Sequence, residues 1–456
     1  MRTLIKNGLL IDPANRIQAR LNLLLEDGRV ALVTEECPGA DQVIDAGGRV
    51  VAPGFIDIHM HEDPVQDGRI DFCIFDAMLR MGVTTAVGGN CGINVYDPVS
   101  YLDLLDRDGA PVNVAMFAGH EYFRRASGAE DKYGPVTEKQ LSDIKKGLRA
   151  ALDAGCVGIS YGLRYVPGTD RKEFLETASC CEKDRCLISA HVRDDEDRVF
   201  GAVAEVAEAG QIYDIPVQIS HIGSMGGFGQ MEQLLRQVDG YRANGLDIAC
   251  DCYPYFAFST RIGTTTYDDG WLERYHCDYS ACQLMEGKYK GQRCTAETFA
   301  EMRRDFPECL TVCYVMTESD IRMALRDPGV MVGSDGLIDN GQGHPRAAGT
   351  FPRFLAGFVR EGDISLYDGI AKMTSVPAKR LGLSRKGRLN KGADADVVIF
   401  DPERIVDGAR FDDPMLPPSG IDYVLIGGEI AAKDCKIVRQ DLGCALRRDK
   451  KDCEKS

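Results

Sequence analysis

Short apolar runs separated by turn residues fill the first fifty residues of the chain. Residues 21–25 and 30–33 flank Asp27-Gly28, which is typical of a two-residue β-hairpin. A second apolar pair, at 43–44 and 50–51, flanks Gly47-Gly48. The pattern predicts short strands and tight turns over residues 1–52.

The same pattern returns near the other end of the chain. Residues 396–400 and 423–426 are apolar runs, and Gly427-Gly428 comes directly after the second one. We therefore expect residues 1–52 and 384–456 to form one small β-domain. The charged tail from Arg447 is expected to be frayed.

Between the two ends, apolar strand-like runs alternate with helical patterns. The clearest helix is predicted over 137–154, where Thr137 and Gln140 make a capping box and Gly155 suits the C-terminal cap. Eight strands that alternate with helices predict an α/β fold, a (β/α)8 TIM-like barrel over residues 53–383. The strand candidates are 53–58, 83–88, 112–117, 156–160, 186–190, 215–220, 246–250 and 329–333.

The stretch from 260 to 312 interrupts this alternation. It is too long for a simple connection between a strand and a helix. It also contains Trp271, His276 and several tyrosines and glycines. We expect an inserted lid over the mouth of the barrel.

Composition limits the partners and the compartment. With 456 residues and 44% hydrophobic content, the chain can bury a core large enough for a barrel and a smaller domain. A net charge of −16 argues against nucleic acid and anionic membranes as partners. The N-terminus shows no signal-peptide pattern and the chain no 18-residue apolar run, so we expect a cytoplasmic protein. The odd number of cysteines, 17, favours reduced thiols over a disulfide framework.

Two histidines at the end of the first predicted barrel strand suggest a metal site. His59 and His61 stand two residues apart, and such side chains point to the same side of a strand. The chain has only seven histidines, and His191 and His221 also follow apolar runs. Barrel enzymes keep their chemistry at the carboxyl ends of the strands, and neutral imidazole is a common zinc ligand.

Three further polar residues follow predicted strands: Cys91, His120 and Asp335. Taken singly, Cys91 is typical of a core thiol, His221 of a hydrogen-bonded core histidine and Asp335 of a turn. Their joint occurrence at strand ends favours a metal site over these separate explanations. His120 fits the same geometry as the ligands, but a role behind the ligands or in substrate contact is equally compatible with the sequence.

These stretches resemble the amidohydrolase superfamily and, within it, the N-acyl-D-amino-acid deacylases, or D-aminoacylases. The resemblance runs through most of the chain and implies a metal-dependent barrel with a small β-sandwich built from both chain ends. It rests on residues 52–61, Gly89-Asn90-Cys91-Gly92, Gly162-Leu163-Arg164-Tyr165, Ile219-Ser220-His221, Tyr253-Pro254-Tyr255, Gly333-Ser334-Asp335-Gly336, His344-Pro345-Arg346, Thr374-Ser375 with Pro377-Ala378, and Gly392-Ala393-Asp394-Ala395-Asp396.

The resemblance implies roles for the candidate ligands. One tight zinc ion would be held by Cys91, His191 and His221. A second, weaker ion would be held by His59 and His61, with Cys91 able to bridge. Asp335 would be both a metal ligand and the general base that passes a proton to the leaving amine. Many other amidohydrolases bridge two metals through a carbamylated lysine, whereas residues 157–171 here contain no lysine.

One position departs from the pattern of the family. Many members carry a lysine two residues after the sixth-strand histidine, where it helps to bind the substrate carboxylate, whereas this chain has Gly223. Arg346 could bind a carboxylate through its planar fork, and a surface salt bridge is an equal alternative for it. The remaining candidates for the carboxylate site are Tyr165, Tyr253 and Ser259.

We therefore expect a zinc-dependent hydrolase of a small-molecule substrate, most simply the amide bond of N-acyl-D-amino acids. One alternative is a hydrolase of cyclic amides or other C–N bonds, as in hydantoinases or dihydroorotases. Another is a non-catalytic amidohydrolase-like protein, although the chain retains every candidate ligand. The sequence does not indicate the oligomeric state, the preferred acyl group or side chain, or whether one metal or two are bound.

Overall fold

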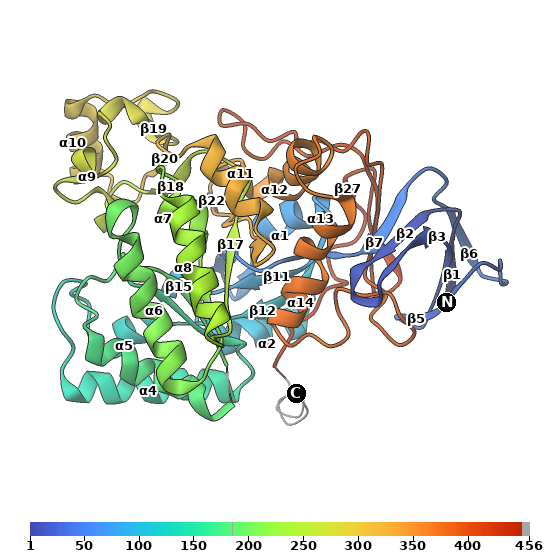
Figure 1. Cartoon of the computed structure of the whole chain (residues 1–456), viewed down its shortest axis with the longest axis horizontal. Coiled ribbons are helices and arrows are strands. Elements are labelled where there is room, and N and C mark those ends of the chain that lie inside the picture. The colour runs from blue at the N-terminus through green and yellow to red at the C-terminus, as the bar shows by residue number, and fades with distance from the viewer. Residues whose placement is uncertain (185, 449–456) are drawn as a thin grey trace.

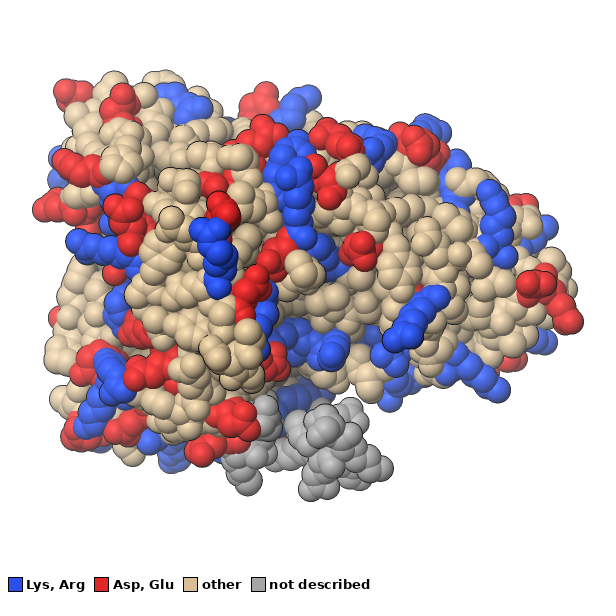
Figure 2. Space-filling view, viewed as in Figure 1, with Lys and Arg blue, Asp and Glu red and all other residues tan. Residues whose placement is uncertain are grey.

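The structure, a computed structural model of the chain, describes residues 1–184 and 186–448 (Figure 1). The expected frayed tail lies, from residue 449 on, outside this part of the chain. Arg447, where the tail was expected to begin, makes an ion pair of 2.6 Å with Asp103. No helix among the described residues combines the length and apolar character needed to cross a bilayer. The face in Figure 2 carries interspersed acidic and basic side chains.

Parallel strands form the centre of the molecule. They pair in two sheets, in the orders β12-β11-β8 and β13-β14-β15-β16-β17-β21. A parallel bridge between Met60 and Gly336 links the chain after β8 to the chain after β21. The strands are β8 (Phe55–Asp57), β11 (Val83–Gly88), β12 (Asn113–Met116), β13 (Ala118–Gly119), β14 (Gly158–Gly162), β15 (Leu187–His191), β16 (Val217–Ile219), β17 (Ile248–Cys252) and β21 (Val330–Val332).

Each predicted strand overlaps an observed one, and a short additional strand follows the stretch 112–117. Within that stretch β12 pairs with β11, whereas β13, directly beyond it, pairs with β14. Phe117 between them donates its N–H to Gly88 over 3.0 Å. The interruption therefore passes the chain from one sheet to the other.

Helices follow most of the parallel strands, as the alternation predicted. The helix expected over 137–154 is α4 (Glu138–Asp153), and its capping box between Thr137 and Gln140 is present. The buried face of α4 includes Leu141, Ile144 and Leu148. The other main helices are α1 (Ile74–Arg80), α2 (Pro98–Asp108), α3 (His120–Ala126), α5 (Arg171–Ala178), α6 (Val199–Tyr213), α7 (Ile222–Gly226), α8 (Met231–Ala243), α11 (Glu318–Arg326), α12 (Arg346–Phe354), α13 (Leu366–Met373) and α14 (Ser375–Arg380).

The predicted hairpin at Asp27-Gly28 is confirmed. It joins β4 (Asn22–Glu26) to β5 (Arg29–Thr34), and both turn residues have positive φ, 49° and 77°. A type I′ turn requires this conformation at both of its central positions. The apolar pair around Gly47-Gly48 behaves differently, since β6 (Gln42–Asp45) and β7 (Val50–Pro53) belong to different sheets.

The two ends of the chain meet in a seven-stranded sheet of order β27-β26-β25-β24-β7-β2-β3. The strand β7 from the N-terminal end pairs with β24 (Val397–Phe400) from the C-terminal end. A four-stranded sheet of order β5-β4-β1-β6 completes this part of the molecule. The other strands are β1 (Arg2–Lys6), β2 (Leu9–Asp12), β3 (Ile17–Arg20), β25 (Ile421–Ile426), β26 (Glu429–Lys433) and β27 (Lys436–Ile437).

The stretch 260–312 folds into a compact unit, at the end of the molecule opposite the N-terminal strands (Figure 1). Its antiparallel sheet has the order β18-β20-β19, and two short helices complete it. Trp271 stacks on Phe299 with ring centroids 5.1 Å apart. Its elements are β18 (Phe258–Arg261), α9 (Trp271–Arg274), β19 (Cys282–Leu284), α10 (Ala296–Asp305) and β20 (Leu310–Cys313).

Candidate metal centre

Four buried ligand groups converge where the parallel strands end. One donor atom from each of His59, Cys91, His221 and Asp335 lies within 4.8 Å of the others. They follow β8, β11, β16 and β21, and parallel strands bring their carboxyl ends to one edge. Residues far apart in the sequence therefore form one cluster because of the strand order.

Cys91 lies at the centre of this cluster. Its Sγ is 3.4 Å from His59 Nε2, 3.4 Å from His221 Nε2 and 3.8 Å from His191 Nδ1. On the other side, Asp335 Oδ1 is 3.2 Å from His61 Nε2 and 3.5 Å from His59 Nε2. The cluster thus has two overlapping halves, one around the thiol and one around the carboxylate.

Three of these residues have left-handed backbone conformations. The φ angles are 54° at Cys91, 33° at His221 and 51° at Asp335. Non-glycine residues rarely adopt such angles, and they do so mainly where surrounding contacts hold them. At Asp335 the backbone N–H donates to His59 O over 2.7 Å, so the fold itself holds the conformation.

The charges of the cluster favour the ligand forms of Cys91 and Asp335. Burial raises the pKa of the Cys91 thiol, but the rings of His59 and His221 lower it by more, to well below its usual value. Burial likewise raises the pKa of Asp335, and Arg346 and His221 bring it well below its usual value. Burial lowers the pKa of His61, yet hydrogen bonds to Asp335 and Cys91 raise it to about 9. Thiolates and carboxylates, not their protonated forms, bind metals.

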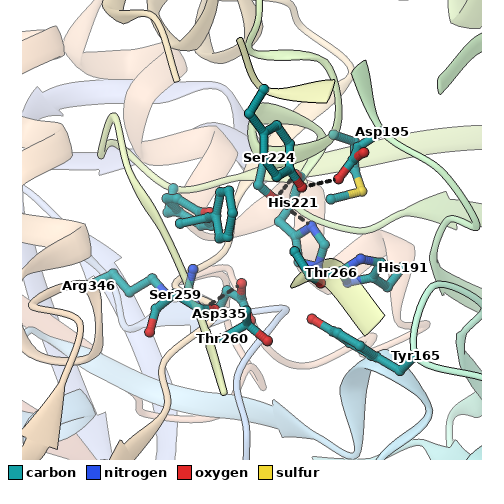
Figure 3. A pocket seen from close by; sticks show the side chains of 14 residues that line it. Tyr165, His191, Asp195, His221, Ser224, Ser259, Thr260, Thr266, Asp335 and Arg346 are labelled. Carbon is teal, nitrogen blue, oxygen red and sulfur yellow. Dashed lines mark hydrogen bonds and ion pairs between the residues drawn. The ribbon is translucent and has the colours of Figure 1, made fainter. Parts of the chain in front are cut away.

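A cavity of about 320 Å³ opens beside the cluster (Figure 3). Tyr165, Tyr253 and Ser259, which the sequence indicated for substrate binding, all line it. The inserted unit contributes Thr260, Thr266 and Tyr275. The remaining lining residues are His191, Asp195, His221, Ser224, Met225, Phe258, Asp335 and Arg346.

Arg346 is neither exposed nor in a surface salt bridge. Its side chain is 2% exposed, and its Nη2 lies 2.9 Å from Asp335 Oδ2. The guanidinium also covers the ring of Tyr253 at 4.6 Å. Among the described residues, Nε and Nη1 of Arg346 and the hydroxyl of Tyr253 have no hydrogen-bond partner. These buried donors are suited to an anion that enters the cavity.

His120 does not join this site. It is buried, but its Nε2 lies 3.0 Å from Glu173 Oε1, and the same oxygen accepts from Arg124 Nε over 3.0 Å. It does not line the cavity beside the cluster. The position of His120 at a predicted strand end was therefore a misleading signal, because its ring points toward helix α5 instead.

The glycine at position 223 has a packing reason. A Cβ added there would lie 2.7 Å from Cys252 Sγ and 2.7 Å from Ile321 Cδ1. No side chain fits in this space unless its neighbours move. A lysine at this position would therefore require the ends of the Cys252 and Ile321 side chains to shift.

The sequence interpretation missed Asp251 and Asp195. Asp251 is fully buried in β17 and contacts His59 Nδ1 at 3.0 Å. Asp195 lines the cavity and accepts a hydrogen bond of 2.5 Å from the Tyr275 hydroxyl. A carboxylate between two cysteines of an apolar strand was a visible signal for Asp251, since such a group needs partners when buried. The contact between Asp195 and the insertion had no comparable signal.

Comparisons with known proteins agree with this architecture. A sequence model described as "Amidohydrolase family" matches residues 73–432. The chain is 32% identical to the N-acyl-D-glutamate deacylase of Alcaligenes xylosoxydans xylosoxydans, over 93% of this chain and 92% of that protein. It is 30% identical to the D-aminoacylase of the same organism, over 98% and 97%.

A solved structure is similar over nearly the whole chain. The N-acyl-D-glutamate deacylase of Bordetella bronchiseptica, complexed with zinc and a phosphonate inhibitor, superposes with a TM-score of 0.88. The two proteins are 30% identical, and the match covers 98% of this chain and 99% of the other. The chain therefore belongs to the amidohydrolase family.

Proposed function

We propose that this protein is a zinc-dependent hydrolase of N-acyl-D-amino acids, which releases a carboxylate and a free D-amino acid. One observation carries the proposal. The cluster around Cys91 and Asp335 borders a cavity lined by Arg346, whose Nε and Nη1 have no hydrogen-bond partner among the described residues. The first feature suits metal-assisted amide hydrolysis, and the second suits the carboxylate of an amino acid. The deacylases to which the chain is similar act on substrates of this class.

The donor set suits zinc. Thiolate and imidazole are the ligands that zinc prefers, and catalytic sites use three protein ligands with one open position. Cys91, His191 and His221 would hold the tight ion. His59 and His61 would hold a weaker one, with Cys91 and Asp335 as further candidate ligands. When bound, zinc supplies Lewis-acid polarisation of the scissile carbonyl.

Asp335 is the residue we assign to proton transfer. It borders the cavity, and its pairing with Arg346 keeps it deprotonated in the free enzyme. The carboxylate can take a proton from the attacking water and give it to the departing nitrogen. Without that proton, the amine would be a poor leaving group.

The substrate carboxylate would lie against Arg346. A carboxylate can accept from Nη1 or from Nε while Nη2 remains on Asp335, but not from both, because Cδ lies between these two nitrogens. The Tyr253 hydroxyl, which has no partner among the described residues, offers another donor. Tyr165 and Ser259 line the same cavity and would complete the substrate site. This arrangement supplies cationic and neutral donors even though position 223 is glycine.

We also propose a (β/α)8 barrel over residues 53–383. The strand order and the bridge between Met60 and Gly336 support it. Residues 1–52 and 384–456, of which 449–456 lie outside the described part of the chain, would form the β-sandwich domain, and 260–312 the lid. The lining residues from the insertion support a role for it in substrate selection.

The proposed reaction is tested with zinc-loaded enzyme and a substrate panel. The panel contains N-acetyl-D-amino acids with apolar, polar and acidic side chains, hydantoins, and dihydroorotate. We expect free amino acid from the linear D-substrates and no ring opening. Ring opening without linear amide hydrolysis would favour the hydantoinase-like alternative, and no turnover of any kind would favour a non-catalytic protein.

A further inference from the structure

A single buried carboxylate, that of Asp251, contacts both halves of the candidate metal centre. Its Oδ1 lies 3.0 Å from His59 Nδ1 and accepts the backbone N–H of His221 over 2.8 Å. Its Oδ2 accepts from Gln218 Nε2 over 2.7 Å. Asp251 is 0% exposed and does not line the substrate cavity. It therefore acts on the site only through other residues.

The contact with His59 determines which ring nitrogen can bind a metal. The carboxylate accepts a hydrogen bond from Nδ1–H, so the neutral ring carries its proton on Nδ1 and its lone pair on Nε2. That nitrogen is the one that faces the cluster, 3.4 Å from Cys91 Sγ and 3.5 Å from Asp335 Oδ1. Without this acceptor, the ring could exchange its proton between the two nitrogens and rotate.

The contact with His221 acts on the backbone. His221 has a φ of 33°, a conformation that needs support from its surroundings. The hydrogen bond from its N–H to Asp251 supplies that support. The ring is held separately, since Ser224 Oγ lies 2.9 Å from Nδ1, so that Nε2 faces Cys91 at 3.4 Å.

We propose that Asp251 is a positioning residue that orients one ligand of each proposed metal subsite. The inference rests on the proposed function only in taking His59 and His221 as ligands. A carboxylate behind a metal-binding histidine fixes the ring orientation, and its loss typically weakens metal binding about 10–100-fold. In this chain the same carboxylate also holds the backbone of a second ligand, His221. Loss of Asp251 should therefore disturb both subsites together.

The contact between His59 and Asp251 is tightly packed against Gly333. A Cβ added at Gly333 would lie 2.9 Å from His59 Cβ and 3.2 Å from Asp251 Cβ. Glycine at 333 thus allows the histidine and the aspartate to approach each other. Gly333→Ala should push the two apart and reproduce part of the effect of losing Asp251.

The neighbourhood also provides a conservative variant. Gln218 Oε1 has no hydrogen-bond partner among the described residues. In Asp251→Asn, Gln218 can turn its amide and accept from the new NH2 group, while the asparagine oxygen still accepts from His59 and His221. Asp251→Asn therefore removes the charge but keeps the acceptor, whereas Asp251→Ala removes both.

The test uses the full-length protein and cobalt(II) as a spectroscopic probe. The Cys91 thiolate gives a charge-transfer band when cobalt binds, so affinity is read without any substrate. We expect Asp251→Ala to weaken cobalt binding about 10–100-fold and Asp251→Asn about 3–10-fold. Asp12→Asn is the control, because Asp12 is equally buried but lies in β2, away from the cluster, and its Oδ2 accepts from Leu389 N–H and Asn15 Nδ2, which an asparagine oxygen can also do. The cobalt affinity of this control should stay within about 2-fold of that of the wild type.

A second readout reports the orientation of the rings in the zinc-loaded protein. Long-range ¹H–¹⁵N spectra with labelled histidine show which nitrogen of each ring carries the proton and which binds the metal, and His59→Gln assigns the relevant signal. We expect His59 protonated at Nδ1 in the wild type and a tautomer mixture in Asp251→Ala. If Asp251→Ala does not fold, Asp251→Asn and Gly333→Ala decide by the cobalt titration.

Wild-type cobalt affinity in folded Asp251 variants, with the His59 tautomer unchanged, would overturn the inference. The outcome is separate from that of the proposed function. Hydrolysis by the wild type together with unaltered Asp251 variants would leave the function standing and remove the positioning role. Weaker cobalt binding in the Asp251 variants of a protein that hydrolyses no amide would support the positioning role and remove the proposed function.

Discussion

Replacement of Arg346 by lysine separates the charge of this residue from its fork geometry. Lysine can still pair with Asp335, because a point charge suffices for the 2.9 Å contact seen at Nη2. It cannot reproduce the two further donors, Nε and Nη1, that lack partners among the described residues. Arg346→Lys should therefore weaken binding of a substrate carboxylate more than it weakens the ion pair with Asp335.

The expected size follows from the one hydrogen bond lost, since a carboxylate can accept from only one of Nε and Nη1. One charge-assisted hydrogen bond contributes about 1.5–3 kcal/mol. Since about 1.4 kcal/mol corresponds to a tenfold change in rate, kcat/KM for an N-acyl-D-amino acid should fall about 10–150-fold. For the matched N-acyl amine, which has no carboxylate, the fall should be less than about 3-fold, because only the pairing with Asp335 is affected.

The assay measures kcat/KM of wild type and variant on both substrates. Arg353→Lys is the matched control, because Arg353 lies on the same helix, α12, and pairs with Asp407 at 3.3 Å, away from the cavity. It should leave both rates unchanged within about 2-fold. Equal losses on both substrates in Arg346→Lys would refute the carboxylate role and leave Arg346 as a structural partner of Asp335.

Three further changes test other parts of the account. Cys91→Ala should lose the tightly bound zinc, as measured by metal analysis, and full zinc occupancy would contradict the ligand assignment. Asp335→Asn should keep zinc and substrate binding but lower kcat about 10²–10⁴-fold, and a near-normal kcat would remove it from proton transfer. Burial lowers the pKa of Lys372 to about 8. Between about pH 8 and 10.5 the unfolded chain therefore binds more protons than the folded one, and the free energy of unfolding should rise with pH by up to about 3 kcal/mol. Lys372→Met should remove this rise from denaturant-unfolding curves, and a parallel pH dependence in both proteins would show that the lysine is not responsible.

Hydrophobic periodicity predicted most of the fold because the strands of a parallel sheet are buried on both faces. The run at 83–88 coincides with β11, and helix α4 was recognised from its capping box. The additional strand β13 after the stretch 112–117 was not predicted, because a change of pairing partner leaves no mark on hydrophobicity. The separation of β6 and β7 into different sheets was hidden for the same reason, although their Gly-Gly turn looked like that of a hairpin.

The candidate ligands could be predicted because they directly follow strands, and strand ends meet at one edge. The residues that contact them in the folded protein could not be predicted. His120 satisfied the same rule, yet its ring pairs with Glu173, which comes from a helix. The burial of Arg346 against Asp335 depends on the angle at which α12 meets the site, and no local pattern encodes that angle. The cytoplasmic location remains an expectation from the sequence.

The central claim is that the cluster around Cys91 and Asp335 hydrolyses N-acyl-D-amino acids. The most direct test measures kcat/KM of the zinc-loaded wild type for both enantiomers of one N-acetyl amino acid, beside the Cys91→Ala variant. The account predicts turnover of the D-enantiomer at least about 100-fold above that of the L-enantiomer, a difference in activation free energy of about 2.7 kcal/mol, and none in the variant. Equal rates for the two enantiomers, or full activity without Cys91, would contradict it.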